Sequence, residues 1–159
     1  MNMKTLVTCL FFLGISVRFF VGGAAAAAAR PNIVVILADD LGIGDMSAYR
    51  PGADVQTPHL DRLAREGLRF TDAHSTASVC TPTRFAFMTG RYGWRQRGTG
   101  IAAGNATLLF PPGTPTTPSL LQQAGYRTGI VGKWHLGLGA TEVDFNAEIK
   151  PGPLEVGFG

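Results

Sequence analysis

The chain has 159 residues, of which 45% are apolar and 16% are charged. This apolar fraction is enough for a hydrophobic core, and the low charged fraction excludes a chain that is disordered throughout. The formal net charge is +3, but the basic residues form no long run, which argues against a nucleic-acid-binding protein.

The first 29 residues have the layout of a secretory signal peptide. Lys4 precedes a mostly apolar run over 6–17, and the alanines over 24–29 supply the small residues typical of a cleavage site. Because the segment is long and Arg18 interrupts it, an uncleaved membrane anchor is the alternative. Cleavage after the alanines would leave twelve basic and eleven acidic residues, a net charge of +1, and a single cysteine, Cys80. We therefore expect an exported protein.

The next segments predict a strand, a helix and a second strand. Residues 32–38 form a continuous apolar run rich in branched side chains, which is typical of a strand buried on both faces. Thr57 suits a helix cap, Pro58 the first turn and Gly67 the end of the helix. A second strand is expected over 68–74.

The same helix pattern recurs over 117–125, and residues 126–131 predict another strand. This alternation favours an α/β fold, a mainly parallel sheet with helices on both faces. In such sheets ligands bind beyond the carboxyl ends of the strands. Since Asp39-Asp40 and Lys133-Trp134-His135 both follow predicted strands, we expect them at one edge of the sheet.

Cys80 is followed by Pro82 and Arg84, at the start of a predicted helix that closes with Gly90. A lone cysteine often serves as a small buried apolar residue. A helix N-terminus, however, favours negative charge, so this position also suits an activated thiolate or an anionic ligand. The Gly-, Pro- and Thr-rich segment 91–115 predicts a long loop that is either functional or mobile.

Two further groups carry candidate chemistry. Two adjacent carboxylates, Asp39 and Asp40, would be brought together by a turn, where their hard oxygen atoms suit Ca²⁺ or Mg²⁺. Their alternative role is to cap a loop. Lys133 and His135 would share one face of an extended chain, although such residues at a strand end commonly face only solvent.

Taken together, these segments resemble the type I sulfatases of the alkaline phosphatase superfamily. Residues 80–84 resemble the family's C-x-P-x-R signature, and residues 31–40 resemble its opening strand and metal-binding aspartates. Three later segments resemble further family landmarks in the same order, at 57–75, 89–93 and 125–137.

The resemblance implies that Cys80 is oxidised to formylglycine by a dedicated formylglycine-generating enzyme, which reads Pro82 and Arg84. One hydroxyl of the hydrated aldehyde would attack sulfur and expel the alcohol, and the second would drive the release of sulfate. An unpaired cysteine in an exported protein then has a chemical explanation.

The resemblance also implies the roles of the remaining site residues. Asp39, Asp40 and the converted residue 80 would hold Ca²⁺, with Mg²⁺ possible. Arg84 would stabilise the anionic nucleophile, Lys133 would bind a sulfate oxygen, and His135 would assist catalysis by a hydrogen bond to the hydrate.

Family members are considerably longer than this chain, so residues 30–159 are expected to form the N-terminal part of a sulfatase catalytic domain. The expected reaction is hydrolysis of an aryl or carbohydrate sulfate. Two alternatives stay open: a phosphomonoester or phosphodiester hydrolase of the same superfamily, and a truncated, inactive secreted binding module.

Overall fold

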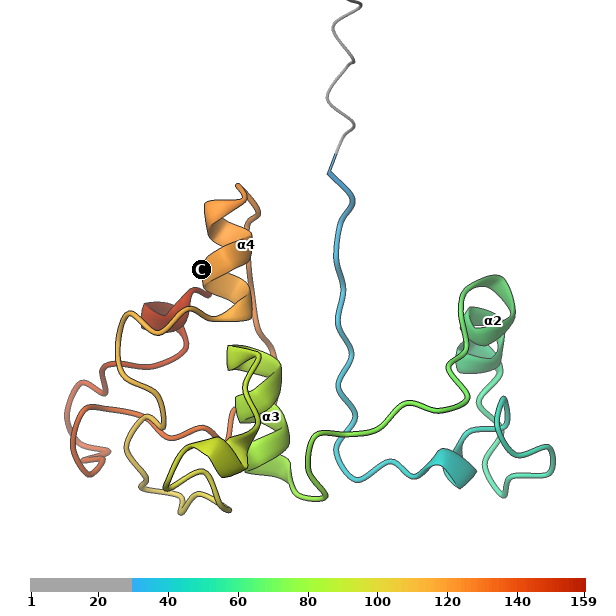
Figure 1. Cartoon of the computed structure of the whole chain (residues 1–159), viewed down its shortest axis with the longest axis horizontal. Coiled ribbons are helices and arrows are strands. Elements are labelled where there is room, and N and C mark those ends of the chain that lie inside the picture. The colour runs from blue at the N-terminus through green and yellow to red at the C-terminus, as the bar shows by residue number, and fades with distance from the viewer. Residues whose placement is uncertain (1–29) are drawn as a thin grey trace, which may run out of the picture. The chain divides into compact units, whose positions relative to one another are not determined.

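The computed structural model describes residues 30–159, so the predicted signal peptide over 1–29 lies outside the described residues. The chain divides into two units, the first reaching Leu37 and the second spanning Ala38–Gly159. The described part of the first unit, residues 30–37, is extended and exposed (Figure 1). None of the helices among residues 30–159 is long and apolar enough to cross a membrane.

The second unit contains α2, α3 and α4, with bounds Pro58–Glu66, Cys80–Thr89 and Thr117–Gln123. Short 3-10 turns accompany them at η1 (Ile43–Asp45), η2 (Gly93–Arg95) and η3 (Leu154–Val156). All three predicted helices are therefore confirmed.

Helix α2 is flanked by Thr57 and Gly67 and begins with Pro58, as predicted, but the predicted side-chain caps differ. The hydroxyl of Thr57 makes no cap hydrogen bond to α2, because it interacts with Ser47 and Asp61 instead. The cap of α4 is Thr116, whose side chain accepts a hydrogen bond from the Ser119 N–H. The Thr117 hydroxyl, which the repeated Thr-Pro pattern predicts as the cap of α4, donates instead to Phe87 O at 2.8 Å.

Among residues 30–159 the structure contains no strand, so the predicted parallel sheet is not confirmed. The segments 32–38, 68–74 and 126–131 leave large apolar side chains exposed, including Val34 at 83% and Val131 at 102%. A strand requires a neighbour that completes a ladder of main-chain hydrogen bonds, and within the described residues no such ladder forms: the Gly159 N–H donates to Thr128 O at 3.0 Å, but this bond is not extended into a pair of strands.

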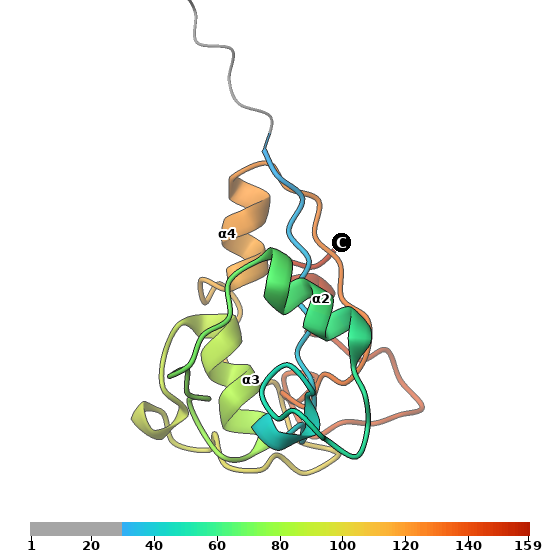
Figure 2. The same ribbon diagram turned by 90° about the vertical axis from the view of Figure 1, so that its right-hand side faces the viewer.

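The hydrophobic core of the second unit lies around α3. Phe85 and Met88 on that helix pack with Phe110, Leu136 and Val156, all of them buried. Trp134 packs edge-on against Phe110 and Phe158 at the margin of this core. The helix α4 lies beside α3 in both views, and Thr117 Oγ1 donates to Phe87 O at 2.8 Å (Figures 1 and 2). The core thus holds α3, with Cys80 as its first residue.

Candidate functional site

Cys80 is the first residue of α3, as the sequence predicts. The preceding residue, Val79, has extended backbone and no side chain caps the helix. Gly90 ends it in the left-handed conformation at φ 66°, with its N–H bonded to Ala86 O. The Cys80 thiol is free and half-buried. It therefore lies where orphan N–H groups and the helix dipole favour a negative charge.

Threonines on either side of the signature proline fix this helix start. The side chain of Thr83 donates to Ala77 O at 2.9 Å and contacts Ser75 Oγ at 3.1 Å. The fully buried Thr81 accepts from the Ala102 N–H through its Oγ1 at 3.1 Å. These contacts were not predicted, and the run of small hydroxyl residues before and after Cys80 was the signal available for them.

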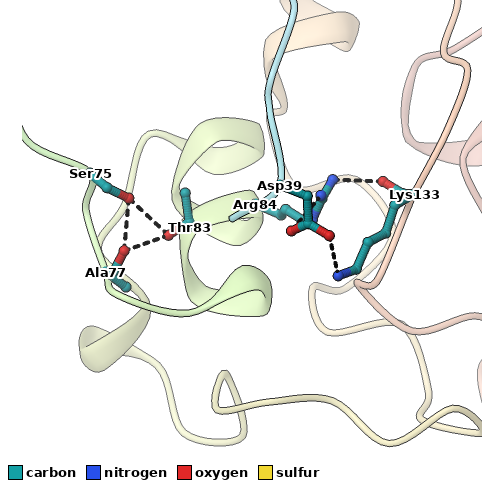
Figure 3. A network of polar contacts seen from close by, with 6 residues as sticks. All are labelled: Asp39, Ser75, Ala77, Thr83, Arg84 and Lys133. Atoms are coloured by element: carbon teal, nitrogen blue, oxygen red, sulfur yellow. Dashed lines mark hydrogen bonds and ion pairs between the residues drawn. The ribbon is translucent and has the colours of Figure 1, made fainter. Parts of the chain in front are cut away.

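Arg84 points away from Thr83 and joins a cluster with Asp39 and Lys133 (Figure 3). Its Nη1 donates to Lys133 O at 2.7 Å and its Nη2 lies 3.4 Å from Asp39 Oδ1. Lys133 Nζ donates to Asp39 Oδ2 at 2.6 Å. The structure thus brings residues 39, 84 and 133 together.

The charges of this cluster shift the pKa values of Asp39 and Lys133 in opposite directions. The hydrogen bond from Lys133, helped by Arg84, lowers the pKa of Asp39 below 3.8. The hydrogen bond to Asp39 raises the pKa of Lys133 above 10.5, and a smaller contribution comes from Cys80. Both residues are consequently charged at neutral pH.

Arg84 is the most buried member of the cluster, with 12% of its side chain exposed against 41% for Asp39 and 44% for Lys133. Its Nε is buried without a hydrogen-bond partner among the described residues. A guanidinium group held in this way keeps its orientation, which suits a fixed positive charge beside a developing anion.

His135 lies in a different position from the one predicted. Its φ of 54° turns the backbone, so Lys133 and His135 do not share the face of an extended strand. The His135 Nε2 lies 2.9 Å from Ala102 O, and its Nδ1 is buried without a partner among the described residues. If Nε2 donates to the carbonyl, Nδ1 is left as an acceptor. His135 is therefore linked to the start of α3 through Ala102, whose N–H binds Thr81.

The backbone around His135 is fixed by the preceding loop. Leu109 N donates to Leu136 O at 3.0 Å, and Leu138 N donates to Ala106 O at 2.9 Å. A Cβ added at Gly137 would lie 1.9 Å from Thr107 O. The long loop over 91–115 is therefore a structural support for the His135 turn in addition to any direct role.

The carboxylates fit a hard cation only in part. Asp39 and Asp40 are adjacent and exposed, and Asp40 has a φ of 59°, which places the pair at a turn. Carboxylate oxygens match the preference of Ca²⁺ and Mg²⁺, but Ca²⁺ takes about six to eight oxygen ligands. No group of three or more acidic, histidine or cysteine side chains suited to a metal occurs within residues 30–159. The thiol of Cys80 is a soft ligand, so residue 80 would fit such a cation only in an oxygen-bearing form.

Comparison with known proteins identifies the family of this site. Residues 31–147 match the sequence profile described as Sulfatase. The chain is 52% identical over 130 residues to the N-acetylgalactosamine-6-O-sulfatase of Bacteroides thetaiotaomicron, covering 81% of this chain and 25% of that protein. It is 49% identical to human arylsulfatase H, over 69% of this chain and 21% of that protein.

Solved structures agree with the sequence matches. A structure from work on glycosaminoglycan metabolism by Bacteroides thetaiotaomicron superimposes with a TM-score of 0.77 at 53% identity, covering 81% of this chain and 27% of that one. A second, Ps i-CgsB, superimposes with a TM-score of 0.64 at 34% identity, covering 82% and 27%. The chain thus spans about a quarter of the length of the curated relatives it matches. It belongs to the sulfatase family.

Proposed function

We propose that this protein hydrolyses sulfate esters, of aryl or carbohydrate alcohols. The observation that carries the proposal is the position of Cys80 at the first residue of α3, four residues before Arg84, which contacts both Asp39 and Lys133. A sulfate ester accumulates negative charge on its oxygens and its leaving group as the S–O bond breaks. A site with two fixed cations next to a helix N-terminus stabilises such a charge.

The nucleophile we propose is residue 80 after oxidation to formylglycine by a formylglycine-generating enzyme. The hydrated aldehyde carries two hydroxyl groups on one carbon. One attacks sulfur and displaces the alcohol, giving a sulfated residue 80. The other then loses its proton, the C–O bond to sulfate breaks, and the aldehyde is restored. An unmodified serine or cysteine lacks the second hydroxyl and would stop after the first step.

The described residues supply the positioning and charge that these steps need. Arg84, oriented by Lys133 O, would stabilise the ionised hydrate. Lys133 would bind a sulfate oxygen with the ammonium group that now faces Asp39. His135, whose Nδ1 is an unused acceptor, would take or return a proton of the hydrate.

Asp39 and Asp40 would hold a Ca²⁺ or Mg²⁺ ion together with residue 80 in its oxygen-bearing form. When bound, the ion would polarise the sulfate group. Their oxygen chemistry supports this assignment, and they would provide part of the coordination shell. Export of the protein is part of the same proposal, because the pattern over 1–29 is typical of a signal peptide.

The test compares an aryl sulfate with the matching aryl phosphate in the complete protein, produced together with a formylglycine-generating enzyme. We expect faster turnover of the sulfate and loss of turnover when calcium and magnesium are chelated. Faster turnover of the phosphate would contradict the proposal and favour a phosphoester hydrolase. Binding of sulfated compounds without turnover would favour the inactive binding module.

A further inference from the structure

We infer that the exposed turn over 91–97 is a binding subsite for an acidic sugar unit next to the sulfated one. This inference deepens the proposed function and rests on it. It assigns part of the substrate specificity to the aromatic residues Tyr92 and Trp94 and to the arginines around them.

The first observation is a pair of exposed, stacked aromatic rings on this turn, with an arginine against one of them. The rings of Tyr92 and Trp94 are stacked, with centroids 5.6 Å apart and planes 22° from parallel. The guanidinium carbon of Arg95 lies 4.9 Å from the centre of the Trp94 ring. Trp94 is nevertheless 73% exposed and Tyr92 49% exposed. Aromatic rings arranged in this way offer flat apolar surface for the C–H face of a sugar ring, and the stacked arginine presents its donors at a fixed orientation.

The second observation is the charge of this region. Residues 73–141 contain six basic residues and no acidic one, whereas the whole chain has a net charge of only +3. Three of the six, Arg91, Arg95 and Arg97, lie on this turn. No ion pair within residues 30–159 neutralises any of them. A planar guanidinium matches a carboxylate or sulfate group with paired hydrogen bonds, so the charge complements an acidic glycan.

The third observation is that the turn is packed against the candidate nucleophile's helix. A Cβ added at Gly93 would lie 2.8 Å from Pro82 Cβ, so the turn closely contacts the first turn of α3. The side chain of Thr99 donates to Gln96 O at 2.8 Å and also bonds to Gly93 O. The same loop returns to α3 at Ala102, whose N–H binds Thr81. Tyr92 and Trp94 are therefore presented from an element fixed to the helix that starts at Cys80.

These observations select one kind of occupant. A small aryl sulfate has no second ring and no second charge to reach the stack. An uncharged sugar would use the aromatic surface but leave the three arginines unpaired. A chain of sugars in which the unit beside the sulfated one carries a carboxylate or sulfate uses both features.

A binding experiment with a catalytically inactive protein separates this inference from the proposed function. The ligand is a tetrasaccharide in which every second sugar is acidic and which ends in N-acetylgalactosamine-6-O-sulfate. The protein is the complete Cys80→Ala variant. Adding Trp94→Ala should raise its Kd roughly tenfold. Adding Arg95→Ala should raise the Kd and reduce its dependence on salt. Trp94→Phe, which retains an aromatic ring, should restore most of the affinity.

The controls use exposed residues outside the turn. Phe145 is 69% exposed and lies in an acidic segment, so Phe145→Ala should leave the Kd unchanged. The monosaccharide N-acetylgalactosamine-6-O-sulfate should lose much less affinity than the tetrasaccharide when Trp94 is replaced. Equal losses for both sugars, or no loss for either, would overturn the subsite.

Accessibility of Trp94 in the complete protein provides a second, independent measurement. The fluorescence of Trp94 is identified as the emission that is lost in Trp94→Phe. Acrylamide should quench this emission, and the tetrasaccharide should reduce the quenching. Resistance to acrylamide without ligand would show that another part of the protein covers the turn, and would also overturn the inference. Failure of sulfate hydrolysis with Trp94-dependent binding intact would refute only the proposed function.

Discussion

Lys133 Nζ lies 2.6 Å from Asp39 Oδ2, which joins two residues that are 94 positions apart in the sequence. Arg84 binds both of them, through Lys133 O and Asp39 Oδ1. This arrangement connects a candidate metal ligand, a candidate sulfate-binding cation and the signature arginine (Figure 3). The roles proposed for Asp39, Lys133 and Arg84 require all three side chains to be charged at neutral pH.

The Asp39–Lys133 pair predicts a pH dependence in the protein studied without added metal ions. Since the pKa of Asp39 is lowered from 3.8, its contribution to folding stability is present above pH 3.8 and is lost as the pH falls through the lower folded value. Since the pKa of Lys133 is raised from 10.5, its contribution is present below pH 10.5 and is lost as the pH rises through the higher folded value.

An NMR titration of the Asp39 carboxyl carbon tests this directly. We expect Asp39 to titrate below its usual range in the wild-type protein, and to shift upward in Lys133→Met, which keeps the length of the side chain but removes its charge. Because both groups are well exposed, the effect on overall stability should be small. An Asp39 pKa that does not respond to Lys133→Met would contradict the pairing.

Arg84→Lys is expected to reduce kcat/KM by about a hundredfold, although it preserves the charge. A single ammonium group cannot contact Lys133 O and Asp39 Oδ1 as the guanidinium fork does. The matched control is Arg62→Lys on α2, where Arg62 and Glu66 form an exposed pair with 68% and 63% of their side chains accessible. Steady-state kinetics on an aryl sulfate should show a defect in Arg84→Lys and none in Arg62→Lys. Equal activity of the two variants would remove Arg84 from the mechanism.

The sequence predicted local structure better than pairing between distant segments. The Thr-Pro and glycine signals identified α2 and α4, and Gly90 correctly marked the end of α3. These signals depend on hydrogen bonds and dihedral angles within a few residues. The strand prediction over 32–38 depended instead on a neighbour that a local pattern cannot specify, and the described residues provide none.

The candidate site shows the same difference between local features, which the sequence predicts, and contacts between distant segments, which it does not. Local patterns singled out Asp39, Asp40, Cys80, Lys133 and His135, but only the order of several family motifs joined them into one expected site. The left-handed backbone of His135 and its contact with Ala102 O were not predictable from its distance of two residues from Lys133. The exposed stack of Tyr92 and Trp94 depends on the turn at η2, which composition alone describes only as a loop.

Conversion of Cys80 predicts a covalent change that mass spectrometry can detect. When the protein is made with a formylglycine-generating enzyme, the peptide containing residue 80 should lose its thiol and gain a carbonyl that reacts with a hydrazide probe. Cys80→Ala should fold normally, because the residue is only half-buried, and should have no turnover. Cys80→Ser should become sulfated once and stop, in a host that modifies only cysteine. An active wild-type protein with an unmodified thiol would contradict the mechanism.

Gly137→Ala is expected to destabilise the turn that holds His135 by more than about 2 kcal/mol. Gly137 has a φ of 73°, and an added Cβ would lie 1.9 Å from Thr107 O, so backbone strain and a collision with the main chain act together. Gly113→Ala separates these causes, because its φ is 82° but no atom lies within 4 Å of the added Cβ. It should therefore cost only about 1 kcal/mol. Urea unfolding of both variants should show a larger loss of stability in Gly137→Ala than in Gly113→Ala. Measurements of kcat under folding conditions should show a loss of activity in Gly137→Ala alone. Similar unfolding midpoints for the two variants would mean that the contact with Thr107 does not constrain this turn.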